Sequence, residues 1–160
     1  MLGRMNPVSP KLVIVRYLSV LPWVILPAVG FLIAGIVLDE EPKLVRIGAY
    51  VGAGIFAGLM IWLLWLIPAQ VKKLGWKETA DELLLSRGKV FHTYTVVPYG
   101  RIQFVDVTAG PIERIFGLKS VELHTASASS DSSISGLVAT EADALRDRLA
   151  VQARERMSGL

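Results

Sequence analysis

Histidine and cysteine most often carry metal or nucleophile chemistry, and this chain has few of either. It contains two histidines, His92 and His124, and no cysteine. Both histidines fall in segments predicted to be β-strands, about 32 positions apart. Without a thiolate or paired carboxylates at metal-site spacing, we do not expect a zinc centre. Each histidine is interpreted as a residue on the surface of a strand.

Other catalytic motifs are missing from the sequence as well. The glycines between residues 48 and 58 lie in an apolar segment and lack the Lys-Ser/Thr pair of a phosphate-binding loop. No Gly-x-Ser-x-Gly nucleophile elbow occurs. We therefore expect a protein that is not an enzyme and needs no cofactor.

Two long apolar runs dominate the first half of the chain. They cover Tyr17 to Leu38 and Ile47 to Pro68, without a charged residue inside either, and a polar segment separates them. About 22 residues of helix span roughly 33 Å, enough to cross the hydrocarbon core of a bilayer. A buried hairpin of a soluble protein is the alternative, but 160 residues are too few to cover one. The sequence predicts a transmembrane helical hairpin over residues 17–68.

The first run is interpreted as a retained span, because it is too long for a cleavable signal peptide and a second run follows. Basic residues flank the hairpin on its two outer sides, namely Arg4, Lys11 and Arg16 before it and Lys72, Lys73 and Lys77 after it. The loop between the runs has Lys43 and Arg46 beside three carboxylates. By the positive-inside rule we expect both termini in the cytoplasm. The three lysines after the hairpin are expected to anchor the chain at the membrane interface.

Small residues in the second run have the spacing that lets helices approach closely. Gly48 and Gly52 form one such pair, and Gly54 and Gly58 form another. The first run offers an internal partner through Gly30, Ala34 and Gly35. Another subunit is the alternative partner, and two pairs on differing faces leave room for both.

The net charge of +3 does not indicate nucleic-acid binding. From residue 69 onward the chain has 12 Lys/Arg against 11 Asp/Glu, so the excess lies in the N-terminal segment. Nucleic-acid binders cluster positive charge on the folded domain. The lipid bilayer and other membrane proteins are the expected partners instead.

The remainder of the chain alternates polar and apolar residues, which is typical of antiparallel strands. A Ser86–Lys89 turn, a Pro98–Gly100 turn, a helical turn closed by Gly117 and a polar loop over 127–135 separate the segments. A regulatory serine cluster is the lesser interpretation of that loop. Strands are predicted over these ranges: Val90–Val97, Arg101–Val107, Leu118–Thr125 and Ser135–Val138. Within the second of them, strict alternation places Ile102 and Phe104 on one face of the strand.

A final helix is predicted from Thr140, whose side chain could cap it. Its apolar stripe repeats at helical spacing: Ala142, Leu145, Leu149 and Ala153. The arginines that follow fall mostly outside the stripe and are expected to pair with Asp143, Asp147 and Glu155. Three parts result: an N-terminal cytoplasmic segment over 1–16, the hairpin over 17–68 and a cytoplasmic domain over 69–160.

Residues 97–118 contain a motif in which Ile102-Gln103, Gly110-Pro111, Arg114 and Phe116-Gly117-Leu118 occur at fixed spacing. With two spans before it, this motif resembles the YdbS-like group of bacterial pleckstrin-homology (PH) membrane proteins over about residues 17–155. The resemblance implies an α+β fold: a two-helix transmembrane hairpin followed by a PH-like antiparallel β-barrel or sandwich, capped by a C-terminal helix. It also implies the bacterial inner membrane as location.

The resemblance implies no catalytic residue. It marks as a possible interaction surface the motif residues Gln103, Asp106, Gly110, Pro111, Arg114 and Gly117. Their alternative role is structural, with Gly110 and Gly117 permitting tight turns and Arg114 pairing with Asp106. A nearly neutral β-domain tethered by a glycine-lined hairpin, without a reactive constellation, predicts a scaffold or accessory subunit of a membrane complex that binds other subunits or itself. The alternative is phospholipid-headgroup binding, although basic residues are sparse there: Arg87, Lys89 and Arg101.

Overall fold

The structure is a computed structural model that describes residues 5–37, 42–88, 92–126 and 132–158. It divides into two compact units. One comprises residues 16–68, and the other combines residues 1–15 with residues 69–160. The N-terminal segment is therefore part of the same unit as the β-domain.

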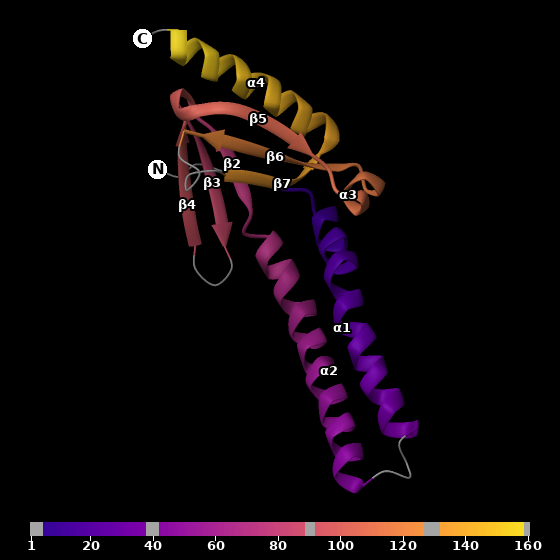
Figure 1. Cartoon of the computed structure of the whole chain (residues 1–160). Coiled ribbons are helices and arrows are strands. Elements are labelled where there is room, and N and C mark those ends of the chain that lie inside the picture. Colours follow the sequence, from indigo (N-terminus) through magenta and orange to yellow (C-terminus); the bar gives the residue numbers. More distant parts are fainter. Residues whose placement is uncertain (1–4, 38–41, 89–91, 127–131, 159–160) are drawn as a thin grey trace. The chain divides into compact units, whose positions relative to one another are not determined.

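Two long helices make up the first unit, α1 (Lys11–Val37) and α2 (Lys43–Val71) (Figure 1). α1 starts before the first predicted run, at Lys11, and covers it as far as Val37, while Leu38 lies outside the described residues. α2 contains the second run and passes through Pro68. Both are long and apolar enough to cross a membrane. The helical hairpin is confirmed, with longer helices than the runs alone indicate.

Within the hairpin, the helices are joined by a few specific contacts. The Tyr17 hydroxyl donates a hydrogen bond to the Leu64 carbonyl over 2.6 Å. The rings of Phe31 and Phe56 stack with centroids 5.8 Å apart. A Cβ atom built on Gly52 would lie 2.9 Å from the Phe31 ring, so this glycine permits the close approach of the two helices.

The second unit contains two antiparallel sheets. The first has the order β1-β2-β3-β4 and the second β5-β6-β7. A 3₁₀ turn at Tyr99–Arg101 joins the two sheets in sequence, α3 (Pro111–Ile115) connects β5 to β6, and α4 (Ala139–Ser158) follows β7. The strands are β1 Asn6–Pro7, β2 Gly75–Glu78, β3 Glu82–Gly88, β4 His92–Pro98, β5 Ile102–Thr108, β6 Leu118–Thr125 and β7 Ser132–Val138. The predicted PH-like antiparallel fold is confirmed as an open sandwich, not a closed barrel.

One predicted boundary is wrong in this unit. Residues 86–88 continue β3 instead of turning, because they pair with residues 92–94 of β4. In the N-terminal segment, β1 pairs Asn6 with Trp76 and Pro7 with Gly75. Burial of the neighbouring Val8 and Leu12 holds this short strand in place.

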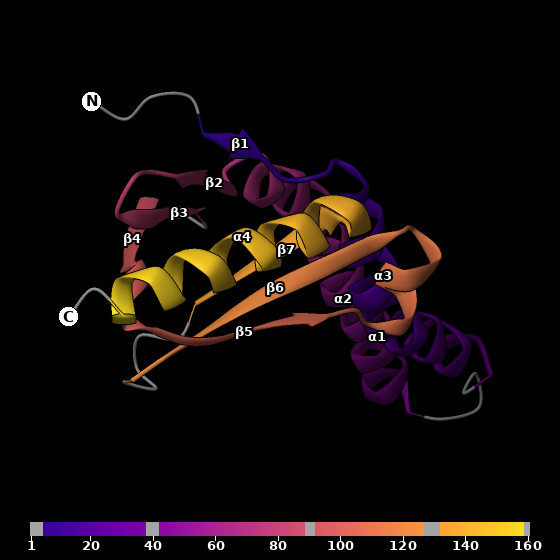
Figure 2. The ribbon, with the colours of Figure 1, turned by 90° about the horizontal axis from the view of Figure 1, so that it is seen from above.

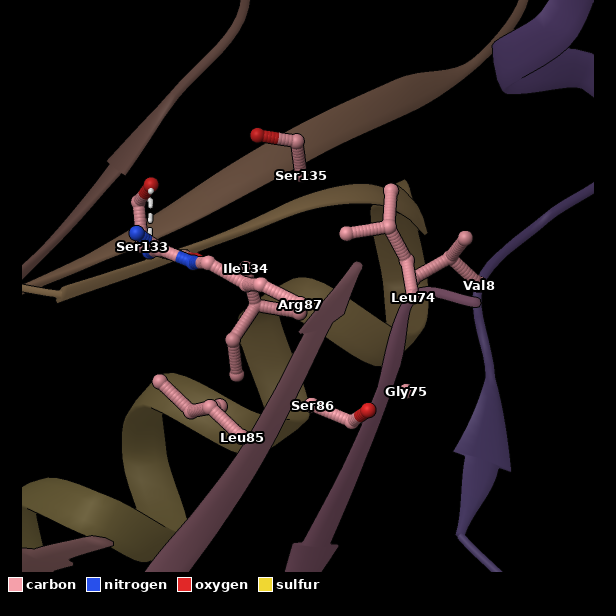
Figure 3. Close-up of a pocket in the computed structure, with 9 residues that line it drawn as sticks. All are labelled: Val8, Leu74, Gly75, Leu85, Ser86, Arg87, Ser133, Ile134 and Ser135. Carbon is pink, nitrogen blue, oxygen red and sulfur yellow. Dashed lines mark hydrogen bonds between the residues drawn. The ribbon is translucent and has the colours of Figure 1, made fainter. Parts of the chain in front are cut away.

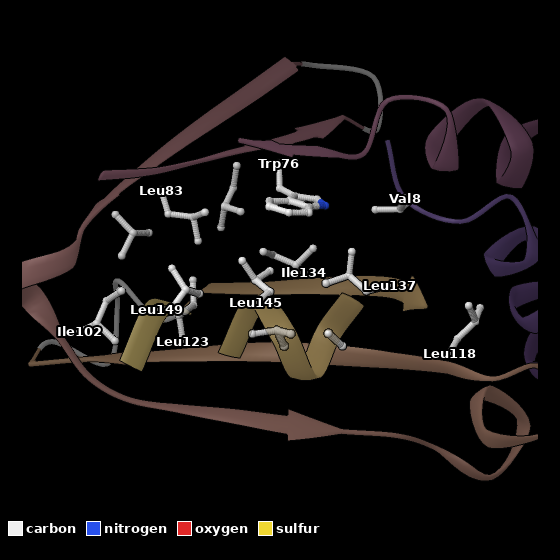
Figure 4. Close-up of a cluster of buried hydrophobic side chains, with 14 of the residues drawn as sticks. Val8, Trp76, Leu83, Ile102, Leu118, Leu123, Ile134, Leu137, Leu145 and Leu149 are labelled. Atoms are coloured by element: carbon white, nitrogen blue, oxygen red, sulfur yellow. The ribbon is translucent and has the colours of Figure 1, made fainter. Parts of the chain in front are cut away.

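One hydrophobic core lies between the sheets (Figure 4). Trp76 and Leu83 enter it from the first sheet, and Leu123 and Ile134 from the second. α4 runs along the second sheet (Figure 2) and contributes its predicted stripe, all of it buried: Ala142, Leu145, Leu149 and Ala153. The stripe is confirmed, whereas the helix begins at Ala139, so Thr140 lies inside its first turn.

One arginine of α4 pairs as predicted, Arg146 with Asp147, whereas two others have partners outside the helix. Arg148 lies 3.1 Å from Glu78 of β2, and Arg156 bonds to Asp81 in the loop after β2. Arg146 pairs with Asp147, and Asp143 pairs with Lys119 of β6. Two arginines thus connect α4 to the first sheet, because that sheet's end lies against the helix.

Tyr99 is fully buried, and its hydroxyl donates to the Thr79 carbonyl over 3.0 Å. Burial, together with the charge of Glu78, raises the pKa of Tyr99 above its ordinary value. Because the folded pKa exceeds the unfolded value of about 10, the contribution of Tyr99 to stability is complete below pH ~10. It is lost as the pH rises through the folded pKa.

We expect Tyr99→Phe to lower the free energy of unfolding by about 1 kcal/mol at neutral pH, through the lost hydrogen bond. The variant should also lose less stability than the wild type between neutral pH and pH 11. Urea unfolding of the detergent-solubilised chain across this range measures both. Tyr94→Phe, at a half-exposed tyrosine, is the matched control, and equal alkaline losses in wild type and Tyr99→Phe would contradict the prediction.

Candidate interaction face

The outer face of the second sheet gathers several of the predicted site residues. In β5, Ile102 pairs with Thr125 and Phe104 pairs with His124, which leaves Gln103 as an extra residue in a β-bulge. The bulge reverses the alternation, so Ile102 is buried at 1% exposure while Phe104 is 52% exposed. The expectation that both share one face is therefore wrong. Phe104 and Asp106 both point outward.

Aromatic and acidic side chains meet on this face. The Phe104 and His124 rings stack with centroids 4.3 Å apart and planes 18° apart. His124 Nε2 lies 3.7 Å from Asp106 and 4.0 Å from Glu122. Thr108 donates from its hydroxyl to Glu122 over 2.9 Å. Phe104, His124 and Glu122 were not among the predicted site residues, since only the bulge and the register bring them to Asp106.

The predicted loop around Gly110 forms the short helix α3, at the other end of the same sheet. Pro111 occupies its first turn, and Glu113 accepts a hydrogen bond from the Gly110 amide over 2.8 Å. Glu113 also accepts one from Ser120 of β6 over 3.2 Å. Gly117 has φ +67°, which favours glycine, while Gly110 has φ −67° and does not need to be glycine.

Arg114 does not make the expected pair with Asp106. Its Nε donates to the Ala109 carbonyl over 3.1 Å, and Asp106 lies beside His124 instead. Arg114 therefore secures the start of α3, whereas Asp106 belongs to the sheet face. The motif residues divide between these two ends, and Gln103 supplies the bulge.

Glu113→Ala is expected to lower the free energy of unfolding by about 1–2 kcal/mol, because it removes both acceptors for Gly110 and Ser120. Ser120 is buried, so its hydroxyl cannot turn freely to water. Glu113→Gln retains one acceptor oxygen and should lose about half as much. Thermal unfolding by near-ultraviolet circular dichroism compares them. Equal stability of Glu113→Ala and wild type would show that α3 does not depend on this carboxylate.

The predicted membrane residues lie elsewhere. Lys72 is exposed after the end of α2, Lys73 is half-buried, and Lys77 lies within β2 opposite Leu84.

Of the paired glycines, Gly52 contacts the first helix, whereas Gly48, Gly54 and Gly58 have no described atom within 4 Å of a built Cβ. Within the described residues, the Gly54/Gly58 pair thus has no close neighbour on the first helix, and its partner stays a prediction. On α1, a Cβ atom built on Gly35 would lie 3.0 Å from the Tyr50 ring.

A small, open pocket lies between the two sheets near the start of the domain (Figure 3). Arg87 donates to the Ser133 carbonyl over 2.6 Å across it, and Ser86 donates to the Lys73 carbonyl. Its lining comes from three strands, β2, β3 and β7, and from the residues next to β1 and before β2: Val8, Leu74, Gly75, Leu85, Ser86, Arg87, Ser133, Ile134 and Ser135. The polar groups of Arg87 and Ser86 are engaged with backbone carbonyls, which indicates a structural role.

Among the described residues, no group of three or more histidines, cysteines or carboxylates is placed to hold a metal ion. The side chain of His92 and residues Lys89 and Asp131 lie outside the described side chains. His124 and its two neighbouring carboxylates are thus a surface cluster.

The family model described as "Bacterial PH domain" matches residues 14–153. The chain belongs to the bacterial PH domain family. The match includes both apolar helices and nearly all of the sandwich, which agrees with the order of elements seen here. No curated protein and no solved structure matches this bacterial PH protein. Membership of the narrower YdbS-like group stays a prediction.

PH domains are generally non-catalytic interaction modules, so the family directs attention to surfaces. In this bacterial PH protein the outer face of the second sheet has an exposed aromatic ring and two carboxylates. We call five residues of this outer face the sheet-B face: Phe104, Asp106, Thr108, Glu122 and His124.

Proposed function

We propose that this bacterial PH protein is a non-catalytic, membrane-anchored interaction or scaffold subunit of a membrane protein complex. The observation that carries the proposal is the outward apolar surface of both helices. Trp23 is 79% and Trp65 is 71% exposed, and Ile36 is exposed as well. Large apolar patches on soluble proteins are rare, and lipid would cover this one.

The orientation in this proposal follows from charge. Lysines follow the end of α2 at Val71, and basic residues precede the apolar part of α1. Both termini and the β-domain then face the cytoplasm at a bacterial inner membrane. The link between the end of α2 at Val71 and the start of β2 at Gly75 is only a few residues long. The β-domain is therefore tethered close to the bilayer. Such a tethered domain is suited to contact neighbouring membrane proteins or a second copy.

Two measurements test the proposal. After alkaline washing, the full chain should stay in the membrane pellet and leave it only with detergent. Mild detergent extraction followed by native mass measurement should then give a species heavier than one chain with its micelle. Release by alkali, or a strictly monomeric species free of any partner, would contradict it.

Phospholipid-headgroup binding is the second candidate, favoured by the exposed Lys72 next to the end of α2. Each basic residue near an anionic bilayer contributes about 1 kcal/mol. The full chain should be used, because Val8, Leu12 and Val15 belong to the core of the domain. Reconstituted into neutral nanodiscs, it should bind anionic vesicles more tightly than neutral ones, and less so after Lys72→Gln. Equal binding to both vesicle types would reject this candidate.

A further inference from the structure

Phe104 is an apolar ring that the backbone turns away from the core. Regular alternation would bury it beside Ile102, and the bulge at Gln103 exposes it instead. β-bulges commonly re-aim a side chain at a functional position. The exposed ring is not loose, because it lies flat on His124 of the neighbouring strand. The two rings form a stacked pair that joins β5 to β6.

The carboxylates beside this ring pair are arranged unfavourably for the isolated domain. Asp106 and Glu122 are directly opposite each other in the register of β5 and β6. Like charges at opposed positions of an antiparallel pair destabilise it. An exposed phenylalanine and two opposed acids, on the same face, both cost stability. A bound cation would offset both costs.

We propose that the sheet-B face binds an arginine side chain of a partner protein. The planar guanidinium would stack on the outer ring face of the Phe104–His124 pair and donate hydrogen bonds to Asp106 and Glu122. Arginine matches both features, since it stacks on aromatic faces and pairs with carboxylates in fixed geometry. This inference rests on the proposed function and names the chemistry of the partner.

The charge of the face decides between partner classes. Anionic headgroups would be repelled by Asp106 and Glu122, so a lipid surface does not fit here. Because β5 is the terminal strand in the order β5-β6-β7, a partner segment can approach Phe104 from the side of the sheet. The occupant is therefore a protein segment with an arginine near its centre.

Photo-crosslinking in native membranes tests the proposal with the full chain. p-Benzoylphenylalanine replaces Phe104, and in a matched control it replaces Tyr94, an aromatic residue of the first sheet with 51% exposure against 52%. Crosslinks from position 104, identified by peptide sequencing, should fall within a few residues of an arginine in the partner. Crosslinks from position 94 should not.

Neutralising the carboxylates gives the second arm. Asp106→Asn with Glu122→Gln should reduce the crosslink yield about tenfold, as expected when an interface loses a principal charge pair. Asp147→Asn, at an exposed carboxylate of α4, should leave it unchanged. The neutralised protein should be at least as stable as wild type, so the loss would not reflect unfolding. Asp106→Arg should abolish the crosslink, and an Arg→Asp change in the partner should restore it.

An unchanged yield after neutralisation, crosslinks to lipid alone, or partner peptides without an arginine would each overturn the inference. These outcomes leave the proposed function intact whenever the native mass still shows a complex. A monomeric mass would instead contradict the proposed function itself.

Discussion

Gly136→Ala is expected to lower the free energy of unfolding of the β-domain by about 2–5 kcal/mol. Gly136 has φ +80°, where an alanine costs about 1–2 kcal/mol of backbone strain. A Cβ there would also lie 2.6 Å from Leu12 Cδ2 and 2.9 Å from Leu12 Cβ, and Leu12 is a buried core residue. Overpacking of a core typically adds about 1–3 kcal/mol. Urea unfolding of the detergent-solubilised chain, followed by near-ultraviolet circular dichroism, measures the loss.

The clash matters because Gly136 anchors the N-terminal segment. Its carbonyl accepts a hydrogen bond from the Ser9 amide over 2.9 Å, next to the start of α1. Displacing Leu12 would therefore weaken both the core contact and this bond. The register shift in β7 between its pairs with Lys119 and Val121 places the glycine at this position.

Gly117→Ala is the matched control for the strain alone. Gly117 has φ +67°, and no described atom lies within 4 Å of a built Cβ. Gly117→Ala should therefore lower the free energy of unfolding only by the ~1–2 kcal/mol of added backbone strain. In a double-mutant cycle, Leu12→Ala should recover part of the Gly136→Ala loss and none of the Gly117→Ala loss. If Gly136→Ala and Gly117→Ala lost the same amount, the contact with Leu12 would carry no energetic weight.

Leu145→Ala is expected to lower the free energy of unfolding by about 2–5 kcal/mol, through lost apolar burial and the cavity left behind. Leu145 is completely buried, and in Figure 4 it points from α4 into the space between the sheets. Because residues of both sheets surround it, the cavity cannot be filled by a shift of α4 alone. The same unfolding measurement applies.

Val151→Ala serves as its control, since Val151 lies on the same helix and is about half exposed. It should change the stability by less than ~0.5 kcal/mol, as surface substitutions usually do. A small loss for Leu145→Ala, similar to that of Val151→Ala, would mean that α4 is not an integral part of the sandwich core.

Local pattern was sufficient for most of the elements. The α4 stripe from Ala142 to Ala153 and the two apolar runs follow from periodicity, because the buried face of a helix repeats along its own sequence. β6 begins and ends at the predicted residues, because Gly117 precedes the strand and a polar segment follows it, and both interrupt the alternation. The family motif also indicated the PH-like fold.

Local pattern was insufficient for the face on which the proposals depend. Asp106 was marked from the motif, but its neighbours Glu122 and His124 come from β6, at a register that no short segment encodes. Phe104 was assigned to the wrong face because one extra residue in β5 is invisible to alternation. The residue types of Phe104 and Gln103 alone do not indicate that a β-bulge lies between Ile102 and Phe104.

The amino-acid sequence alone determined the helical hairpin, the strand-rich domain and its closing helix, because each depends on interactions between residues close in the chain. The tertiary structure alone decided that residues 5–15 join the β-domain, that the sandwich stays open, and that Phe104 turns outward over His124. Those features depend on pairing between distant strands, where burial of Leu12 against Gly136 and the register of β5 on β6 outweigh local preference.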